Sequence, residues 1–572
     1  MMDYNQLLGN LTKDFSGLAR VKIAVLGEIP TQHMVKATRS WGYEAGLDLD
    51  IFEGAFDKID QEILDSSSVL YQFKPEFVFI FPSLDKWKER FYSCALSDKA
   101  GFSDRFLEQV RMFYEALSKR MPVKLVMANM PGFDDRVFGN YANKTRLSWL
   151  YQVRRINVGL MELSQQIPDL FINDIAALNE TRGSKELWDV RNDINIHMPY
   201  SLDGISVIAR NAVDIIQASR GHFKKCLILD LDNTLWGGVV ADEGLENIQI
   251  GGLGIGKAFS DLQRWVKQLK ERGILLAVCS KNDLPVAEEP FLKHPDMILR
   301  KEDFVVFMVN WDAKPDNIHL IAQKLNIGFD AMVFVDDSTF ERQLVKSHCP
   351  GLTVVDMPED PSEYLGFLQG LNLFETSSYV QEDRDRTQQY QEESSRQQAR
   401  SLFINQDDFL QNLSMRAVIG TLDTFVVPRA AQLTQRSNQF NLRTVRYSIQ
   451  DIQRLKDSED HLHFTVSLKD KFGDYGLIGL VILKKMHPAL FIDTWIMSCR
   501  VFQRNVEHLM LNEMANLARQ NGFDLLVGEY CPTPKNGIVK GLYQQTGFVT
   551  DGSQWMLNVS SCKPLNHYIT VV

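Results

Sequence analysis

Two aspartates stand at the end of an apolar segment near the middle of the chain. Asp230 and Asp232 follow KKCLIL, which has the apolar character of a buried strand, and a single residue separates them. Because side chains alternate along a strand, both carboxylates point to the same side and repel one another. A metal ion, a shared proton or solvent at a loop could offset this repulsion. The pair is therefore the first candidate for chemistry.

Further apolar segments end in side chains that suit phosphate chemistry. They supply Ser280 in VCSKND, Lys314 in WDAKPDN, and the pair Asp336 and Asp337 in VFVDDSTFER. Mg²⁺ binds oxygen ligands and would relieve the repulsion between carboxylates, while a lysine and a hydroxyl can hold the remaining phosphate oxygens. This set, in this order along the chain, is typical of phosphoryl transfer.

The two carboxylates of the first pair can take different parts in such a reaction. Asp230 could attack phosphorus and form an aspartyl phosphate. Asp232 could protonate the leaving group and later activate water. The alternative is a pocket that only binds a phosphorylated partner, with the rest of the chain acting as an adaptor. A binding pocket has no need of Asp232, so the sequence favours an enzyme.

The elements that must position these residues are short apolar strands separated by helices. In residues 221–375 nearly every such strand ends in polar residues, which is where open α/β sheets bind their ligands. We therefore expect a parallel sheet, formed by the segments 225–232, 274–282, 304–309, 331–338 and 352–358. The intervals from Asp232 to Ser280 and from Lys314 to Asp336 are too short for a large lid domain, so we expect an open site.

The rest of the chain predicts two further domains and a linker. Residues 1–220 repeat fully apolar strands at 21–27, 77–83, 123–129 and 170–178, which indicates a parallel sheet covered on both faces. Residues 376–405 contain the polar stretch 381–400, interpreted as a solvated connecting helix. Residues 406–572 mix strands with a helix, VEHLMLNEMANLARQ, and a closing strand, FDLLVGEY. The expected fold class is α/β, in three domains.

Composition limits the classes of function. The chain has 572 residues, a net charge of −11 and seven cysteines, none of them in a CxxC pair. No disulfide framework or zinc knuckle is indicated, and a reducing compartment fits. An acidic chain with no basic stripe, no apolar run of membrane-spanning length and no signal peptide predicts a cytoplasmic protein without nucleic-acid or membrane partners.

The motifs resemble those of the haloacid-dehalogenase-like (HAD-like) phosphatases, subfamily IIIC. DLDNT (230–234), Ser280, Lys314 and Asp336 with Asp337 match the four motifs of that superfamily in order. The resemblance implies that Asp230 is the nucleophile and Asp232 the acid/base. It also implies the groups that bind the substrate, namely Thr234, Ser280, Asn282 and Lys314. Mg²⁺ would bind Asp230, the main-chain carbonyl of Asp232, Asp336 and Asp337.

More narrowly, the chain resembles the FkbH-like family over nearly its whole length. The segments that carry this resemblance are LDLDNTLWGGVVADEG, LLAVCSKND, NWDAKPDNI, FVDDSTFER, QLTQRSNQFNLRTVRY and DKFGDYGLIG. Some members dephosphorylate a three-carbon glyceryl unit from 1,3-bisphosphoglycerate and load it onto the phosphopantetheine thiol of an acyl carrier protein. Others are known only as phosphatases. The resemblance therefore implies a phosphorylated small molecule and an acyl carrier protein as partners.

The flanking domains carry weaker resemblances. The first is similar to an SGNH hydrolase, but the only hydroxyl near GEIPTQ is Thr31, and Asp193 lies four residues before His197, so we expect it to be non-catalytic. The third resembles a GNAT acetyltransferase, with Gln503 and Asn505 where that family has glycines. A second alternative for function is therefore an acyltransferase that works mainly through the third domain.

Two other features are open to functional and structural interpretations. A polar segment of the third domain is either an acyl or acceptor site or a satisfied domain interface, and its candidate residues are Gln435, Asn438, Asn441 and Arg446. Residues 251–258 nearly spell a P-loop, but Ala258 lacks the hydroxyl that Mg²⁺ needs. We interpret them as a flap that leads into a helix. Cys226 and Cys279 are interpreted as small core residues.

Overall fold

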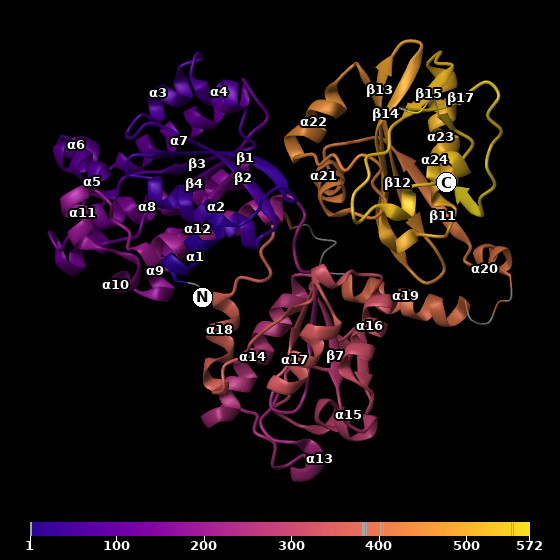
Figure 1. Ribbon diagram of the computed structural model, residues 1–572, viewed down its shortest axis with the longest axis horizontal. Coiled ribbons are helices and arrows are strands. Elements are labelled where there is room, and N and C mark those ends of the chain that lie inside the picture. The colour runs from indigo at the N-terminus through magenta and orange to yellow at the C-terminus, as the bar shows by residue number, and fades with distance from the viewer. Residues whose placement is uncertain are drawn as a thin grey trace. The chain divides into compact units, whose positions relative to one another are not determined.

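The computed structural model describes residues 3–572 apart from 380–383, 385, 401–402, 404, 551 and 553. It divides into two compact units, Met1–Ser219 and Arg220–Val572. The α/β class with two parallel sheets and a mixed sheet is confirmed (Figure 1). None of the described helices combines the length and the apolar character that crossing a membrane requires.

The first unit contains a five-stranded parallel sheet in the order β2-β1-β3-β4-β5. Its strands are β1 (Ala19–Gly27), β2 (Leu47–Glu53), β3 (Phe77–Phe81), β4 (Lys124–Ala128) and β5 (Leu170–Asn173). The main helices are α2 (Gln32–Glu44), α5 (Leu84–Ser93), α7 (Phe102–Ser118), α8 (Trp149–Gln166) and α12 (Leu202–Ser219). Shorter helices are α1 (Tyr4–Leu8), α3 (Ile59–Leu64), α4 (Val69–Phe73), α6 (Leu96–Lys99), α9 (Ile175–Arg182), α10 (Ser184–Leu187) and α11 (Val190–Ile196).

Helices cover both faces of this sheet, which explains why its central strand β3 is apolar throughout and why β1 is apolar from Ile23 to Gly27. Ala24 and Leu26 of β1 pack in the core beneath α7 and α8, while Ile23 and Val25 pack in the core beneath α2 and α12. Successive residues of one strand therefore face different cores. The strands expected from the sequence are found, except that the segment 170–178 is a strand only as far as Asn173 and continues as α9 from Ile175. β2 is an additional edge strand.

The second unit begins with a five-stranded parallel sheet in the order β10-β9-β6-β7-β8. Its strands are β6 (Cys226–Leu229), β7 (Leu275–Ser280), β8 (Val306–Val309), β9 (Met332–Val335) and β10 (Thr353–Val354). Its helices are α13 (Val240–Glu243), α14 (Gly254–Glu271), α15 (Leu284–Lys293), α16 (Lys314–Leu325), α17 (Thr339–His348) and α18 (Tyr364–Gly370). Between β6 and β7 the chain forms only α13, α14 and their connections, so this HAD-like sheet has no large cap.

Helix α19 (Arg386–Arg400) leads to the third part of the chain. The polar segment Gln381–Arg400 was expected to be a solvated connecting helix, and residues 381–383 and 385 lie outside the described part. Within α19 the expectation of a solvated face is wrong at Arg396, which is 1% exposed. Its Nε and Nη2 atoms donate to the carboxylate of Asp470 at 2.7 and 3.0 Å. This buried pair fixes α19 to the mixed sheet.

The mixed sheet has the order β16-β17-β15-β14-β13-β12-β11-β18. Its strands are β11 (Met415–Gly420), β12 (His461–Lys469), β13 (Asp474–Met486), β14 (Ala489–Met497), β15 (Leu525–Gly528), β16 (Val549–Thr550), β17 (Trp555–Asn558) and β18 (Ile569–Val571). Its helices are α20 (Gln406–Asn412), α21 (Val427–Arg436), α22 (Ile449–Asp457), α23 (Val506–Gln520) and α24 (Leu542–Gln545).

This mixed sheet is antiparallel except where β14 meets β15 and β11 meets β18. Helix α23 packs on one face, and α21 and α22 pack on the other. The segment FDLLVGEY was expected to close the sheet, and this is wrong: it forms β15, which lies inside the sheet. Three further short strands follow it and extend both edges.

Candidate active site

The residues predicted for phosphate chemistry lie on loops at one edge of the HAD-like sheet. Asp230 directly follows β6, Ser280 ends β7, and Asp336 directly follows β9, while Lys314 is the first residue of α16. These strands are parallel neighbours, so their carboxyl ends lie at the same edge. The topology therefore brings together residues that are far apart in the sequence.

Three carboxylates converge at this edge, and we refer to Asp230, Asp336 and Asp337 as the acidic cluster. One oxygen atom of each lies within 4.8 Å of the other two. Asp336 is fully buried, Asp230 is 7% exposed and Asp337 is half-buried. Carboxylates this close and this poorly solvated repel strongly. Positive charge is needed to offset the repulsion between these carboxylates.

Lys314 provides part of that charge from a buried position. Its Nζ lies 2.6 Å from Oδ2 of Asp336 and 3.1 Å from Oδ1 of Asp230. Burial disfavours the ammonium, but Asp230 and Asp336 outweigh this and raise the pKa of Lys314. Burial, and then Asp230, raise the pKa of Asp336 to about 6 although Lys314 lowers it. One lysine therefore does not neutralise the cluster.

The donor set fits a hard divalent cation. Oδ1 of Asp230 is buried and accepts no hydrogen bond from the described residues. The Lys314 ammonium is at ion-pair distance from this atom, 3.1 Å away. A buried carboxylate oxygen without a donor, beside two more carboxylates, offers the all-oxygen ligands that Mg²⁺ prefers. The residues present could hold this ion.

Asp232 lies beside the cluster and is held in one orientation. Its Oδ1 accepts from Nε1 of Trp236 at 2.9 Å and from the Val240 amide at 3.1 Å. Its Oδ2 accepts from Nδ2 of Asn282 at 3.2 Å. Burial raises the pKa of Asp232 and Asp230 adds to this, although the three donors act against it. A fixed carboxyl group with a raised pKa is suited to giving and taking a proton.

The hydroxyls of the other predicted binding residues are buried at the same edge. Thr234 is 1% exposed, and its Oγ1 accepts from the Asp337 amide at 3.2 Å. Ser280 is 2% exposed at the end of its strand. Thr234 therefore fixes the loop that carries the acidic pair, and Asn282 reaches the site through its contact with Asp232.

The sequence did not single out the residues that support this loop. Nη1 of Arg342 donates to the main-chain oxygens of Asp336 and Asp337 at 2.8 and 2.5 Å. The Ser338 amide donates to Oδ1 of Asp336 at 2.8 Å. Arg342 is buried, four residues after the Ser338 N-cap of α17. Only its place in the motif STFER could have marked it, because a lone helical arginine is more often exposed.

A small flap follows the first motif. Gly237 and Gln249 exchange two main-chain hydrogen bonds of 3.0 and 2.8 Å. Gly238 has φ 90°, and a Cβ there would lie 2.6 Å from the Glu243 carboxylate, so this turn requires glycine. The segment 251–258 leads into α14, which begins at Gly254, as the flap interpretation expected.

The two cysteines near the motifs lie in the core. Cys226 and Cys279 are both fully buried. Burial raises the pKa of both thiols, that of Cys279 to about 12, and so disfavours the nucleophilic thiolate.

The candidate residues of the third domain form a polar loop, residues 435–446, that contacts the start of the HAD-like sheet. Arg446 donates to the main-chain oxygen of Gln435 and, at 2.5 Å, to Oδ1 of Asn438. Asn441 is buried, and its Oδ1 accepts from the Thr444 amide at 2.8 Å. These hydrogen bonds all lie within the loop, so Asn441 and Arg446 support its conformation.

The polar loop does not lie beside the acidic cluster. A Cβ on Gly221 would lie 2.2 Å from the Gln435 oxygen and 2.6 Å from Arg446, and Gly221 precedes β6, whereas Asp230 follows it. The residues of β6 that separate Lys225 from Asp230 span roughly 16 Å at ~3.3 Å each. The structure therefore does not bring this loop to the edge of the sheet that carries the acidic cluster.

In the loop before α23, two residues that are not glycine have a left-handed backbone conformation. Gln503 and Asn505 have φ of 61° and 59°, in the left-handed region that side chains disfavour. Arg400 donates to Oε1 of Gln503 at 3.2 Å, and Gln406 donates to its main-chain oxygen at 3.3 Å. Contacts with the chain segment before the sheet therefore support this loop.

In the first unit, Thr31 precedes α2 and His197 follows α11. The Thr31 hydroxyl donates to Oε1 of Glu53 at 2.6 Å. His197 is exposed at the end of α11, with φ 56°. Burial, and then Asp85, raise the pKa of Asp193 to about 6.

Comparisons with known proteins bear on both units. The family model described as FkbH, N-terminal domain, matches residues 22–217. The N-terminal part of protein BF1531 from Bacteroides fragilis, which contains a phosphatase domain and was solved in complex with Mg, is 42% identical. The similarity covers 66% of this chain and 100% of that one, with a TM-score of 0.64. No curated protein matches the chain.

Two acetyltransferases are among the other similar solved structures. The ribosomal-protein-S18-alanine N-acetyltransferase from Escherichia coli is 17% identical over 26% of this chain and 99% of its own, with a TM-score of 0.20. The spermidine N-acetyltransferase from Vibrio cholerae, in complex with CoA and spermine, is 14% identical over 25% of this chain and 96% of its own, with a TM-score of 0.21.

Proposed function

The chain belongs to the FkbH-like family, and from this premise we propose that its HAD-like domain is a Mg²⁺-dependent phosphatase or phosphotransferase. The observation that carries the proposal is the acidic cluster, whose three carboxylate oxygens lie within 4.8 Å of one another. Lys314 contacts two of these carboxylates from a buried position. When bound there, Mg²⁺ would offset the negative charge of the carboxylates and of a phosphate group.

Asp230 acts as the nucleophile in this proposal. One of its carboxylate oxygens attacks phosphorus, a P–O bond to Asp230 forms, and the P–O bond to the leaving group breaks. Asp232 gives its proton to the departing oxygen. It then takes a proton from a water molecule that attacks the same phosphorus, which releases phosphate and restores Asp230.

The remaining predicted residues bind and orient in this scheme. Lys314 and the Ser280 hydroxyl hold phosphate oxygens, and Thr234 keeps the loop of Asp336 and Asp337 in place. Asn282 holds Asp232 through the hydrogen bond to its Oδ2. The fixed orientation of Asp232 supports an enzyme over a pocket that only binds phosphate, since binding alone would not require it.

Magnesium is expected to stabilise the protein through the acidic cluster. Adding Mg²⁺ to the wild type should raise its melting temperature and EDTA should reverse the rise. A ligand at a hundredfold excess over its Kd stabilises the folded state by about 2.7 kcal/mol. Asp336→Asn removes one of the three converging carboxylates and should lose most of the shift, measured by differential scanning calorimetry.

Asp296→Asn is the matched control because Asp296 is an exposed aspartate of the same domain. It should respond to Mg²⁺ as the wild type does. If Asp336→Asn keeps the full shift while it remains folded, Mg²⁺ binds elsewhere and the assignment of the ligands is wrong.

We also propose a specific substrate, on the basis of the family resemblance. The three-carbon acyl group of 1,3-bisphosphoglycerate would pass to the phosphopantetheine thiol of an acyl carrier protein. Sulfur bonds to the carbonyl carbon, the bond from that carbon to the acyl phosphate oxygen breaks, and the thiol proton leaves with the phosphate. The Asp230 reaction removes the other phosphate. The polar loop of the third domain is the proposed acceptor site, separate from the metal site.

Asn438→Ala is expected to lower the loading of the carrier about tenfold. Its Oδ1 accepts from Arg446, and a hydrogen bond to a charged group contributes about 1.5–3 kcal/mol. The measurement is the intact mass of candidate carriers after incubation with 1,3-bisphosphoglycerate and Mg²⁺.

Asn516→Ala, at an exposed asparagine of α23, is the control. Equal loading by both variants contradicts the acceptor site, whereas loss of activity toward a generic phosphate ester would point to the metal site. Asn441 is less suitable because it is buried in the loop.

A further inference from the structure

Four exposed apolar side chains lie at the edge of the HAD-like sheet that carries the acidic cluster, and we refer to them as the apolar rim. Leu253 directly precedes α14, Leu284 is the first residue of α15, and Trp311 lies three residues before Lys314, which begins α16. Phe340 is the second residue of α17. Their exposed fractions are 89%, 44%, 67% and 70%. Each of these helices connects two parallel strands, so it begins at the carboxyl edge of the sheet.

The apolar rim extends along both sides of Asp230. In the sheet order β10-β9-β6-β7-β8, β6 lies between the strand that leads to Phe340 and the strands that lead to Leu284 and Trp311. At ~4.8 Å between neighbouring strands, the three steps from β9 to β8 span roughly 14 Å. An extended peptide covers that length with about four residues at ~3.3 Å each. A substrate that contacts both sides of the rim is therefore larger than a three-carbon metabolite.

The groups that react lie below this rim. Asp230 is 7% exposed, Lys314 is 3% exposed and Ser280 is 2% exposed. A bulky molecule cannot bring a phosphate group that is attached directly to its body into contact with side chains this buried. A phosphate at the end of a single extended side chain can enter, while the chain that carries it rests on the rim.

Trp311 is exposed but held in place. Its Nε1 donates to Oδ1 of Asp283 at 2.8 Å. Asp283 directly follows Asn282, whose side chain donates to Asp232. Tryptophan is enriched among the residues that contribute most to protein–protein binding. An indole that a hydrogen bond already holds also loses little freedom when a partner covers it.

The segments that carry the rim are acidic. Asp242, Glu246 and Asp312 are exposed on them, and none of the three forms an ion pair with another described residue. In the connections from β6 to α14, β7 to α15, β8 to α16 and β9 to α17, all of which the structure describes, Lys281 is the only basic residue. It lies 2.7 Å from Glu341 in an ion pair. Further negative charge on a substrate would therefore be repelled, and basic groups beside its phosphate would be attracted.

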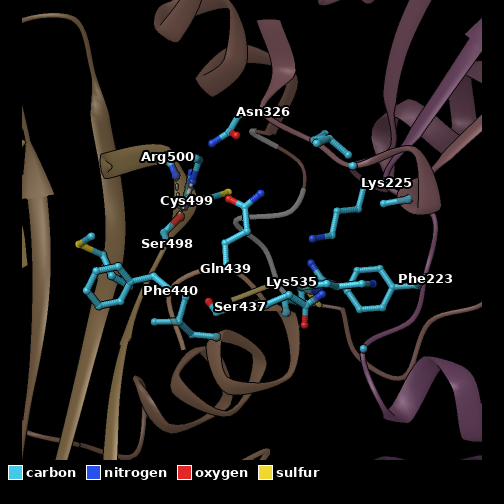
Figure 2. Close-up of a pocket in the computed structure, with 18 of the residues that line it drawn as sticks. Phe223, Lys225, Asn326, Ser437, Gln439, Phe440, Ser498, Cys499, Arg500 and Lys535 are labelled. Carbon is cyan, nitrogen blue, oxygen red and sulfur yellow. Dashed lines mark hydrogen bonds between the residues drawn. The ribbon is translucent and has the colours of Figure 1, made fainter. Parts of the chain in front are cut away.

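The cavity in Figure 2 is not part of this surface. It has a volume of about 380 Å³, and Figure 2 shows Lys225 pointing into it opposite Gln439. Lys225 directly precedes β6, whereas Asp230 directly follows this strand. A molecule whose phosphate reaches Asp230 from the carboxyl edge therefore contacts the rim and not this cavity.

We propose that the apolar rim docks a basic, partly apolar segment of a phosphorylated protein, whose phosphorylated side chain enters the recess and reaches Asp230. Apolar side chains of the segment pack on Trp311 and Phe340, and its lysine or arginine side chains pair with Asp242 and Asp312. The P–O bond to the partner's side chain breaks as proposed above, and Asp232 gives its proton to that oxygen, which leaves as a hydroxyl group. This docking surface presupposes the proposed phosphatase activity but not the proposed glyceryl substrate.

The test uses the full-length protein with Mg²⁺ and three seven-residue peptides that each contain a central phosphoserine. The first peptide has Lys and Leu on either side of the phosphoserine, the second has Glu and Leu, and the third has Lys and Ser. The Lys–Leu peptide should have the highest kcat/KM. The values for the Glu–Leu peptide and for free phosphoserine should be lower by about tenfold or more, because each lacks contacts that the rim offers.

Two substitutions test whether the rim causes this preference. Trp311→Ala should lower kcat/KM about tenfold for the Lys–Leu peptide and much less for the Lys–Ser peptide, because only leucine packs on the indole. Asp312→Asn should lower kcat/KM about two- to fivefold for both lysine peptides and not for the Glu–Leu peptide. The controls are Phe425→Ala, at a 93% exposed side chain of the third domain, and Asp524→Asn, at an exposed aspartate of that domain. Both controls should match the wild type with every peptide.

Phosphonate analogues of the same peptides, which cannot be hydrolysed, separate docking from turnover. Their affinities, measured by calorimetric titration in the presence of Mg²⁺, should follow the same order and show the same loss in Trp311→Ala. If the wild type binds the analogues in this order but hydrolyses no phosphate ester, the docking surface is supported and the phosphatase proposal fails.

Equal affinity for the Lys–Leu and Glu–Leu analogues overturns the proposal, and so does wild-type affinity of Trp311→Ala for the Lys–Leu analogue. Hydrolysis of free phosphoserine as efficient as that of the Lys–Leu peptide also overturns it and identifies a small-molecule substrate. Should Trp311→Ala fail to fold, Phe340→Ala takes its place with the same expected loss.

Discussion

Asp230→Asn is expected to abolish turnover of a generic phosphate ester, with a loss of roughly a thousandfold or more. The amide keeps the size of the side chain but cannot attack phosphorus. It also removes one carboxylate from the acidic cluster, so the affinity for Mg²⁺ should fall as well. Phosphate release at saturating Mg²⁺ measures the first effect, and calorimetric titration with Mg²⁺ measures the second.

The same experiment distinguishes the enzyme from the adaptor. Asp296→Asn should retain wild-type turnover, since that exposed side chain lies outside the acidic cluster. If the wild type binds phosphate stoichiometrically without turnover, the adaptor hypothesis is favoured. Full activity of Asp230→Asn in the presence of Mg²⁺ would falsify the assignment of the nucleophile.

Arg396→Met is expected to lower the free energy of unfolding by about 3–5 kcal/mol, the range found when a buried ion pair loses one partner. Asp470 would keep its buried carboxylate but lose two hydrogen bonds of 2.7 and 3.0 Å. It would retain a hydrogen bond from the Tyr475 hydroxyl at 3.0 Å and the Arg504 guanidinium at 3.5 Å. These remaining contacts favour the lower end of the range. Urea unfolding monitored by circular dichroism provides the measurement.

Arg400→Met is the matched control for that measurement. Arg400 is exposed at the end of the same helix, and exposed substitutions usually change stability by no more than about 0.5 kcal/mol. The argument for a buried anchor is wrong if both variants unfold at the same urea concentration.

In the first sheet, the sequence predicted the strands that are buried on both faces and did not predict the edge strand β2. β3 is apolar throughout, and β1 is apolar from Ile23 to Gly27, because each faces two cores. β2 reads LDLDIFE and lies at the sheet edge, where Arg20 reaches Asp50 at 2.7 Å. Its alternating acidic residues do not resemble a buried strand. The short strands after β15 have no apolar run that would mark them.

The candidate site was predictable because chain order and parallel topology suffice to bring strand ends together. That rule alone predicts that Asp230, Lys314 and Asp336 lie close together. Arg342 does not, since its contacts are with main-chain oxygens that a sequence does not reveal. The burial of Arg396 was also unpredictable, because its partner Asp470 lies on a distant strand and the surrounding residues are polar.

The short connection between β6 and β7 affects the timing of the reaction. This domain has no lid that must open or close, so it imposes no gating step between binding, chemistry and product release. With no cover from this domain itself, water would reach an aspartyl phosphate on Asp230 by the same path as a substrate. The covalent state should therefore be short-lived, and any acceptor other than water must already be in place when it forms. Selection among phosphate esters then depends more on which molecule is delivered to the site than on which molecule fits beneath a lid.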